Sequence, residues 1–216
     1  NLVSNTGVVA SDQAATTGTS RYVLAACSFG GDKGIFGFGS GGSAISNIVS
    51  NTGVVATDVA NSGTAREVGA ACEYGTDTAI FGFGSTSHGG ITNLVTNVGV
   101  IGSDVAEVGT ARHSPAACGY GFDKGIFFGG DDGSASDITN LVSNTGVIQS
   151  DGTGVGTARY GLAGTQYDGD KGIFGFGNDG SVTNVTNLVS NVGVLQSDQA
   201  ATTGTARAWL AACSFN

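Results

Sequence analysis

Residues 63–84 read GTAREVGAACEYGTDTAIFGFG, and closely similar strings recur along the whole chain. Each version carries an arginine directly after Gly-Thr-Ala or Gly-Thr-Ser, and these arginines are Arg21, Arg66, Arg112, Arg159 and Arg207. Successive arginines are 45, 46, 47 and 48 residues apart. A nearly fixed period of this length indicates an architecture in which each repeat folds as one supersecondary unit.

The pattern within one repeat predicts four short strands. The first follows the arginine, as in residues 22–29, and a glycine- and aspartate-containing turn leads to the second at residues 34–39. The second strand alternates phenylalanine with glycine, so we expect phenylalanines on one face and glycines on the other, where a neighbouring sheet can approach closely. A third strand at residues 47–50 and a fourth at residues 54–56 flank a tight hairpin at residues 51–53.

Four antiparallel strands per repeat, five times over, predict an all-β fold, namely a five-bladed β-propeller. We expect residues 1–216 to form a single repeat domain whose units begin near the five arginines, with strands in residues 1–12 completing the last blade. The phenylalanine-glycine strand occurs only four times, so the fifth blade is incomplete or is closed by both termini. Three explanations stay open: a longer natural chain, a strand from a second chain, or a three-stranded fifth blade. A two-layer sandwich, the alternative fold, does not explain the nearly constant period.

The repeats resemble kelch repeats, in which an arginine precedes the first strand and an apolar second strand ends in paired glycines. Phe127-Phe128-Gly129-Gly130 is similar to that doublet, and residues 35–39 are a looser version. The tryptophan usual in the fourth kelch strand is missing, since Trp209 is the only tryptophan. The near-identity of the units also resembles repetitive kelch-like proteins of phages and environmental sequences, or a consensus-type design. This resemblance implies an extracellular or virion-associated location.

Composition and charge argue against several classes of partner. The chain has 39 glycines, 40% hydrophobic residues and a formal net charge of −9. Eight Lys and Arg residues, scattered over the repeats, do not form the basic stripe that nucleic acid requires. An anionic membrane surface would repel the chain for the same reason, and we see no apolar run of about 20 residues that could span a membrane.

Two residue types recur at fixed positions and are expected to be structural. Cys27, Cys72, Cys118 and Cys213 each follow Ala-Ala, and Thr165 takes this position in the remaining repeat. A residue that threonine can replace is more often a small core-facing side chain than a disulfide partner or a metal ligand. The arginines could form a ring that binds an anion at the axis, but such arginines more often bond to backbone carbonyls or to an aspartate. One aspartate precedes each arginine: Asp12, Asp58, Asp104, Asp151 and Asp198.

The loops divide into a monotonous set and a varied set. In a four-stranded meander, the loops from strand two to three lie on the same face as those from strand four to the next strand one. These loops vary between repeats, as do the residues just after each arginine, whereas the turns of the opposite face are nearly constant. A varied face on a uniform scaffold is typical of binding, although exposed loops also drift and the aromatic residues could instead fill the central channel. The candidate ligand- or partner-binding residues are Tyr22, Leu24, Glu67, His113, Tyr160, Leu162 and Trp209.

Catalytic and metal-binding constellations are scarce in the sequence. His88 and His113 are the only histidines, and neither has a metal-ligand partner at a recognisable spacing. The acidic strings at residues 131–137 and 178–180 could coordinate calcium, but Asp-Gly pairs are also ordinary turn residues. We therefore expect no enzyme, no cofactor and no metal. The predicted function is a structural or interaction scaffold with a protein partner on the varied face, and homo-oligomerisation through an open blade edge is possible in this scheme. The alternative is a multivalent glycan-binding propeller.

Overall fold

The computed structural model describes residues 1–13, 18–41, 43–84, 89–106, 108–199 and 204–214. Every regular element within these ranges is a β-strand, which confirms the all-β prediction. The strands form four separate antiparallel sheets, none of which closes into a barrel. No helix in the described part of the chain is long and apolar enough to cross a membrane.

Each sheet is a meander of consecutive strands from one sequence repeat, and we call the sheets units 1 to 4. Unit 1 contains β1 (Ala25–Phe29), β2 (Lys33–Gly37), β3 (Ile45–Val49) and β4 (Val59–Ala60); unit 2 contains β5 (Ala70–Tyr74), β6 (Thr78–Gly82) and β7 (Thr92–Val95); unit 3 contains β8 (Ala116–Tyr120), β9 (Lys124–Phe128) and β10 (Thr139–Val142); unit 4 contains β11 (Ala163–Tyr167), β12 (Lys171–Gly175) and β13 (Thr186–Val189). The strand register is the same in all four units. The cysteine of Ala-Ala-Cys, or Thr165 in its place, pairs with the isoleucine of the second strand, as Cys72 does with Ile80.

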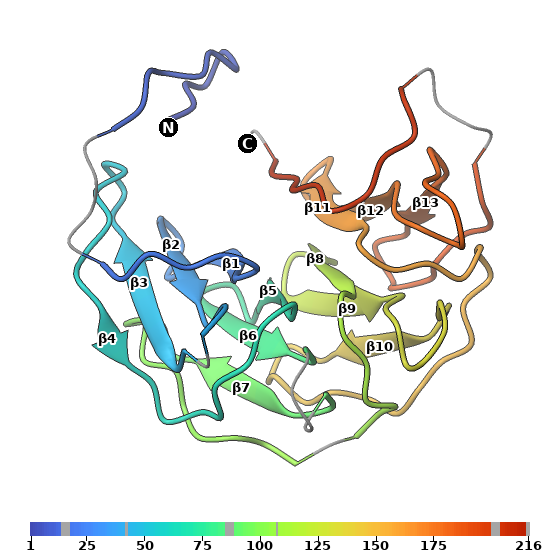
Figure 1. Cartoon of the computed structure of the whole chain (residues 1–216), viewed down its shortest axis with the longest axis horizontal. Coiled ribbons are helices and arrows are strands. Elements are labelled where there is room, and N and C mark those ends of the chain that lie inside the picture. The colour runs from blue at the N-terminus through green and yellow to red at the C-terminus, as the bar shows by residue number, and fades with distance from the viewer. Residues whose placement is uncertain (14–17, 42, 85–88, 107, 200–203, 215–216) are drawn as a thin grey trace.

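The four units follow one another around an arc, with β1, β5, β8 and β11 on its inner side (Figure 1). Contacts between consecutive first strands, β1 with β5, β5 with β8 and β8 with β11, hold this order. The arc is open between unit 4 and unit 1, and both chain termini lie toward this opening (Figure 1). This repeated-sheet arrangement is consistent with a propeller.

Residues with left-handed backbone conformation end the first and second strands, and these strands are shorter than the sequence predicts. The first strand was expected from residue 22, but Val23 has φ 50° and β1 begins only at Ala25. The second strand was expected to reach Gly39, but Phe38 has φ 59° and β2 ends at Gly37. A left-handed residue cannot continue an extended strand, so both strands are shorter than predicted.

The outer part of each unit also differs from the prediction. Residues 54–56 were expected to form a fourth strand, but only Val55 pairs there, in an isolated bridge to Val49. A fourth strand is present in unit 1 alone among the described residues, at β4, where Val59 and Ala60 pair with the start of β3. The bridge follows at once on a tight turn in which Gly53 has φ 79°. The chain then leaves the sheet, so the ladder does not extend.

The hydrophobic core consists of three clusters, one between each pair of neighbouring units. The two phenylalanines of a second strand face opposite neighbours: Phe81 packs toward unit 1, whereas Phe83 packs toward unit 3. The predicted placement of both on one face is therefore wrong. The cause is the left-handed backbone of Phe83, with φ 60°, which breaks the two-residue alternation.

Glycines of the second strand do allow close approach, as predicted. A Cβ atom at Gly37 would lie 2.7 Å from Cζ of Phe81, and one at Gly82 would lie 2.9 Å from Cζ of Phe127. The resulting ring pairs between units are edge-on, with Phe38 and Phe81 centroids 5.4 Å apart. Each glycine thus provides the space in which a phenylalanine of the next unit packs.

Candidate functional site

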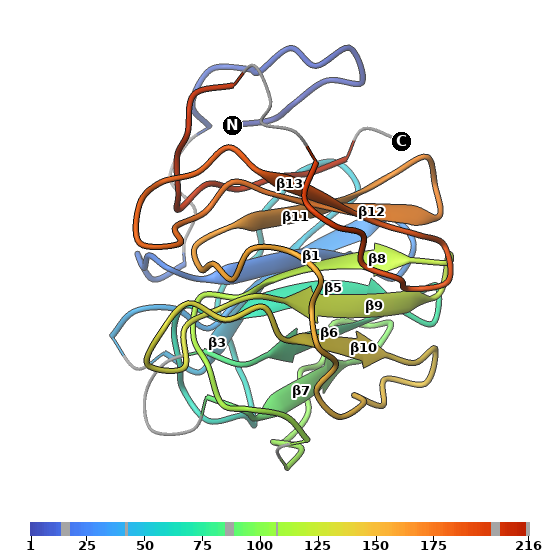
Figure 2. The same cartoon turned by 90° about the vertical axis from the view of Figure 1, so that its right-hand side faces the viewer.

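The loops lie on two faces, as the meander topology predicts (Figure 2). On one face, the residues after each arginine pair with the loop between strands two and three: Tyr160 with Asn178, and His113 with Asp131. On the opposite face, the first turn is linked to the outer hairpin, for example by the bond from Asn51 Nδ2 to Asp32 Oδ2. We call the first of these the variable face. It comprises the residues after each arginine and the loops from strand two to strand three.

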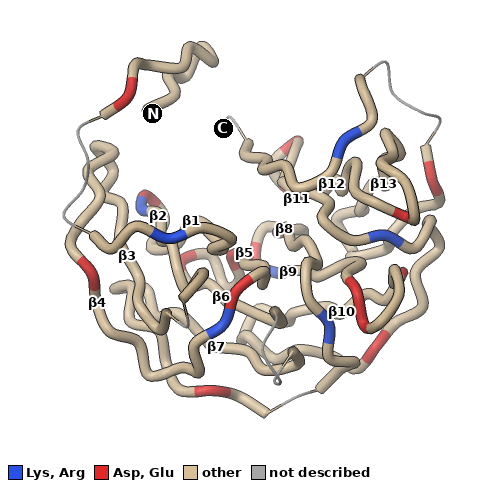
Figure 3. Tube along the Cα trace, in the orientation of Figure 1, with Lys and Arg blue, Asp and Glu red and all other residues tan. Residues whose placement is uncertain are grey.

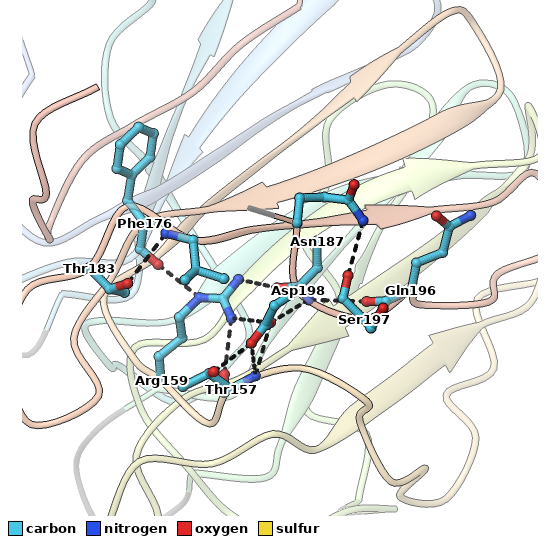
Figure 4. A network of polar contacts seen from close by, with 10 residues as sticks. Thr157, Arg159, Phe176, Thr183, Asn187, Gln196, Ser197 and Asp198 are labelled. Atoms are coloured by element: carbon cyan, nitrogen blue, oxygen red, sulfur yellow. Dashed lines mark hydrogen bonds and ion pairs between the residues drawn. The ribbon is translucent and has the colours of Figure 1, made fainter. Parts of the chain in front are cut away.

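A polar network fixes the backbone behind the variable face in every unit, and Figure 4 shows it in unit 4. Arg159 donates from Nε to the carbonyl of Phe176, from Nη1 to the carbonyl of Thr157 and from Nη2 to Oδ1 of Asn187. Asn187 donates to Asp198 Oδ1 at 2.8 Å, and Asp198 accepts from both the backbone and the hydroxyl of Thr157. The network therefore ties the start of the unit to its second and third strands and to its outer loop.

The network recurs in units 1 to 3. Arg21 bonds to Asn47, and Arg112 bonds to Asn140, each at 2.6 Å. In unit 2 the equivalent atoms, Arg66 Nη2 and Asn93 Oδ1, are buried and have no partner among the described residues, so this contact is open. The network members of units 1 to 4 are Thr19, Arg21, Asn47 and Asp58; Thr64, Arg66, Asn93 and Asp104; Thr110, Arg112, Asn140 and Asp151; Thr157, Arg159, Asn187 and Asp198.

The aspartate of each network is the one that follows the arginine in sequence, not the preceding one. Arg21 lies 3.8 Å from Asp58, whereas Asp12 accepts a bond from Asn1. An aspartate partner is thus present, as predicted, but it is the aspartate that follows the arginine and not the one that precedes it. Arginine and aspartate of one repeat lie at opposite ends of its meander, and only the folded sheet brings those ends together.

Burial and charge show why these arginines serve structure rather than anion binding. Arg112 and Arg159 are buried, and the guanidinium of Arg112 stacks on Phe83 at 3.9 Å. Burial lowers the pKa of Arg112 to about 10, so the group is still charged at neutral pH. Because its donors point to protein oxygens, a soluble anion has no access to them.

Five left-handed residues form a chain of hydrogen bonds on the inner side of the variable face. Four of them donate the N–H to the carbonyl of the equivalent residue in the preceding repeat: Trp209 to Gly161, Gly161 to Ser114, Ser114 to Val68, and Val68 to Val23. All five have φ between 50° and 61°. This series of hydrogen bonds fixes the backbone at each left-handed residue and so fixes the positions of the two residues beside it. Four of the seven candidate residues, Tyr22, Glu67, His113 and Tyr160, directly precede such a position.

Two of the three aromatic candidates are exposed on the inner side of the variable face, and the third, Tyr160, is half-buried. Tyr22 is 72% exposed and Trp209 is 61% exposed. The rings of Tyr160 and Trp209 are 5.9 Å apart at an interplanar angle of 59°, so the structure brings these two together across neighbouring repeats. The half-exposed Glu67 and His113 lie at the equivalent place in units 2 and 3. His113 Nδ1 lies 2.9 Å from the Ser114 hydroxyl.

The two leucines among the candidates belong to the packed frame. Leu162 is 6% exposed and lies in the core between units 3 and 4. A Cβ atom built at Gly39 would lie 3.3 Å from Cβ of Leu24, so Leu24 packs against the end of its own second strand. Leu162 therefore varies within the core, whereas Leu24 varies at a half-buried position.

Charge is distributed unequally between the two faces, and acidic residues are spread over all units (Figure 3). All three lysines, Lys33, Lys124 and Lys171, lie at turns of the face opposite the variable face. The variable face carries the half-exposed or exposed carboxylates of Glu67, Asp131, Asp132, Asp137 and Asp179. Arg207 is the exposed basic residue at its edge. The charged side chains of the variable face are thus predominantly acidic.

Two of these acidic loops were considered for calcium, and both use their oxygens in turns. Asp131 Oδ1 accepts from the backbone N–H of Gly133, and Asn178 Oδ1 accepts from that of Gly180. Within the described residues, no group of three His, Cys, Asp or Glu side chains could hold a metal ion. These local bonds explain the Asp-Gly and Asn-Asp-Gly strings as turn chemistry.

A central cavity, which the sequence did not predict as a site, runs between the first strands. Its volume is about 400 Å³ and its lining includes Ser28, Glu73, Gln166 and Ser214. The cysteines that precede these positions in four of the repeats also belong to the lining. The sequence did mark Ser28, Glu73, Gln166 and Ser214, because each one directly follows Ala-Ala-Cys or Ala-Gly-Thr.

Cys27, Cys72 and Cys118 are packing residues, as predicted, whereas Cys213 is exposed and the prediction is wrong for it. All four thiols are free. A Cβ atom at Gly125 would lie 2.5 Å from Sγ of Cys72, and one at Gly172 would lie equally close to Sγ of Cys118. Burial raises the pKa of Cys72 to about 12, so this thiol is protonated and poorly nucleophilic at neutral pH.

No family model and no curated protein matches this chain.

Proposed function

We propose that the chain is a non-catalytic interaction scaffold, a five-bladed kelch-like propeller that binds a protein partner on its variable face. The fifth blade would be formed from residues 205–214 and 1–12, which flank the opening of the arc. The hydrogen-bonded chain on the inner rim supports this arrangement because it has five positions, the last of which is Trp209.

One observation carries the functional part of the proposal. The frame is repeated almost unchanged from unit to unit, yet four residue types occupy the five positions before the left-handed residues: Tyr22, Glu67, His113, Tyr160 and Ala208. Large amphipathic side chains are the groups that anchor protein interfaces. A rigid frame that exposes Tyr22 and Trp209 is therefore suited to binding one partner through a composite surface.

The charge of the variable face favours a partner with basic residues. Carboxylates such as Glu67, Asp131 and Asp179 lie on the same face as the exposed aromatic rings, and lysines lie only on the opposite face. Arginine or lysine side chains of a partner could pair with these carboxylates and stack on Tyr160 or Trp209. We expect such binding to weaken as salt is added, because exposed charge pairs are screened.

The test is selection of binders from a displayed random peptide library, followed by affinity measurement on two variants. The triple variant Tyr22→Ala, Tyr160→Ala, Trp209→Ala removes the aromatic anchors, and the control Lys33→Ala, Lys124→Ala, Lys171→Ala changes only the opposite face. We expect selected peptides to be basic and to lose at least tenfold in affinity for the triple variant alone. Peptides that lose affinity only for the lysine variant would refute the proposal.

Glycan binding is the second candidate function, favoured by the pairing of Tyr160 with Trp209 at 5.9 Å. Adjacent exposed aromatic rings can stack on a sugar face. Trp209 is the only tryptophan, so its fluorescence reports binding there directly. Glycan-array hits that change this fluorescence, and that Tyr160→Ala abolishes, would favour a lectin over a protein-binding scaffold.

A further inference from the structure

The central cavity is lined at one level by four different residues from four equivalent positions. Each of these residues pairs with the second residue of the second strand in its own unit, so all four occupy the same place in the meander. The inner strands that carry them contact one another in sequence order around the arc (Figure 1). The residues are Ser28, Glu73, Gly119 and Gln166 of units 1 to 4. The cavity therefore has a chemical character that the repeat itself does not dictate.

Glu73 is the only charged residue in this lining. Its side chain is half-buried, and its carboxylate makes no hydrogen bond and no ion pair within the described part of the chain. Burial raises the pKa of the neighbouring Cys72 thiol to about 12, and the negative charge of Glu73 adds to this rise. The carboxylate thus acts on the cavity without a counter-charge from the protein.

Unit 2 also lacks the lysine that the other units carry at the start of the second strand. Lys33, Lys124 and Lys171 each pair with an aspartate of the adjoining turn. Thr78 takes this place in unit 2, and its hydroxyl donates to the carbonyl of Tyr74 at 2.6 Å. The turn aspartate of this unit, Asp77, accepts a bond from the neutral amide of Asn97 instead. The negative charge near Glu73 is therefore not offset by a lysine of its own unit.

Gln166 supplies a neutral polar group on the other side of the cavity. A Cβ atom built at Gly119 would collide with the amide Nε2 of Gln166, so this amide lies over β8 in the space that the glycine leaves. The amide makes no hydrogen bond to the described residues, and it offers one acceptor oxygen and one donor nitrogen. Ala71 and Ala117 add small apolar surfaces to the same lining. A carboxylate, an amide and a short apolar wall thus line one cavity.

We propose that the central cavity binds a small organic cation that has one primary ammonium group and a short alkyl part. The ammonium group donates to the carboxylate of Glu73 and to Oε1 of Gln166, and the alkyl part lies against Ala71 and Ala117. The cavity volume of about 400 Å³ is within the usual range for sites that bind small molecules. These four residues belong to units 2 to 4 and lie apart from the variable face, so the inference does not rest on the proposed function.

The donor set favours an ammonium group over a metal ion. Within the described residues, no three His, Cys, Asp or Glu side chains come together as ligands, whereas calcium takes six to eight oxygen ligands, several of them charged. An ammonium group carries one positive charge and three N–H donors. It therefore matches one carboxylate with a neutral oxygen beside it. Partial burial of Glu73 strengthens the pairing, because the attraction between charges is less screened away from bulk water.

The probe is n-butylammonium chloride, titrated into the full chain in phosphate buffer, which contains no competing amine. We expect saturable one-to-one binding by titration calorimetry and a higher unfolding temperature at saturating probe. The control ligand 1-butanol has the same alkyl chain without the charge and should bind at least tenfold more weakly. Calcium chloride should give no saturable heat. Equal binding of 1-butanol, or saturable calcium binding that n-butylammonium displaces, would overturn the inference.

Matched variants locate the site at Glu73. Glu73→Gln keeps the shape of the side chain but removes its charge, and it should weaken n-butylammonium binding about tenfold or more. Glu67→Gln makes the same change of net charge in the same unit, on the variable face, and should bind as the wild type does. The triple variant of the variable face should also bind normally, which separates this site from the proposed function.

Stability distinguishes a binding role of Glu73 from a structural one. Because the carboxylate has no partner among the described residues, Glu73→Gln should unfold in urea at the same or a higher midpoint than the wild type. A lower midpoint would assign Glu73 a structural role and contradict the inference. Absence of saturable n-butylammonium binding to the wild type, or equal binding by Glu73→Gln, would overturn it outright.

Discussion

The buried arginine of each unit illustrates how one side chain can join four parts of a sheet. Arg112 reaches the carbonyls of Thr110 and Gly129 and the side chain of Asn140 with three different nitrogens. A planar guanidinium presents its donors in a fixed fork, which an ammonium group cannot reproduce. The recurrence of arginine therefore predicted a structural role. The residues to which the arginine bonds could not be predicted, because they are distant in sequence.

Replacing Arg112 by alanine should destabilise the protein by about 3 kcal/mol, because the oxygens of Asn140 and Gly129 would be left buried without a donor. Urea unfolding followed by circular dichroism measures this loss. Lys124→Ala, at an exposed turn, should change the free energy of unfolding by less than about 0.5 kcal/mol. Similar losses for both variants would contradict the structural role given to the arginine.

Asp151 makes stability depend on acid pH. Partial burial acts to raise its pKa, but hydrogen bonds from Thr110 and Asn140 outweigh this and hold the pKa below the usual 3.8. Its contribution is therefore present above about pH 4 and is lost as pH falls through the folded-state pKa. Asp151→Asn cannot be protonated, so its free energy of unfolding should fall less steeply between about pH 4 and pH 2. An unchanged slope in urea unfolding would contradict this assignment.

At the scale of elements, the second strand is the piece that joins neighbouring units. It carries one phenylalanine to each side and a glycine that receives the ring of the next unit. Unit 3 keeps the contact with a different spacing, since Phe128 stands at the glycine position and packs on Phe174 at 5.3 Å. The paired glycines of the kelch-like doublet follow from this shift, because Gly129 takes the left-handed position occupied by Phe83 in unit 2.

Two glycines at the same strand position provide a matched test of this packing. Gly82→Ala would place a methyl group 2.9 Å from Phe127 and should destabilise the protein by about 1–3 kcal/mol. Gly175→Ala would meet only Thr186, at 3.3 Å, and should cost less than about 1 kcal/mol. Thermal and urea unfolding compare the two directly. Equal losses would mean that the ring of Phe127 does not determine the requirement for glycine.

The position of the first and second strands could be predicted from the sequence, but their ends could not. Alternation and turn residues located β5 and β6, and the Ala-Ala-Cys string located the inner strand. The left-handed Val68 and Phe83 could not be anticipated, because neither valine nor phenylalanine favours positive φ. Contacts with the next unit hold both residues there, and those contacts exist only in the folded molecule.

At the scale of the whole molecule, the sequence indicated which face varies but not which of its side chains are exposed. Tyr22 and Trp209 lie in solvent, whereas Leu162, at an equally variable place, lies in the core. Tyr22 directly precedes a left-handed residue and Trp209 is one itself, whereas Leu162 directly follows one. The polar lining of the central cavity was missed for a related reason, since its residues become neighbours only when the first strands meet around the axis.

On the proposed function, the repeat units of this chain form a ring that folds by itself. The most direct measurement is the native mass by light scattering, together with urea unfolding at two protein concentrations. We predict a monomer of 21.2 kDa whose unfolding midpoint does not depend on concentration. A multiple of that mass, with stability that rises with concentration, would show that copies of the chain complete one another and would contradict the account.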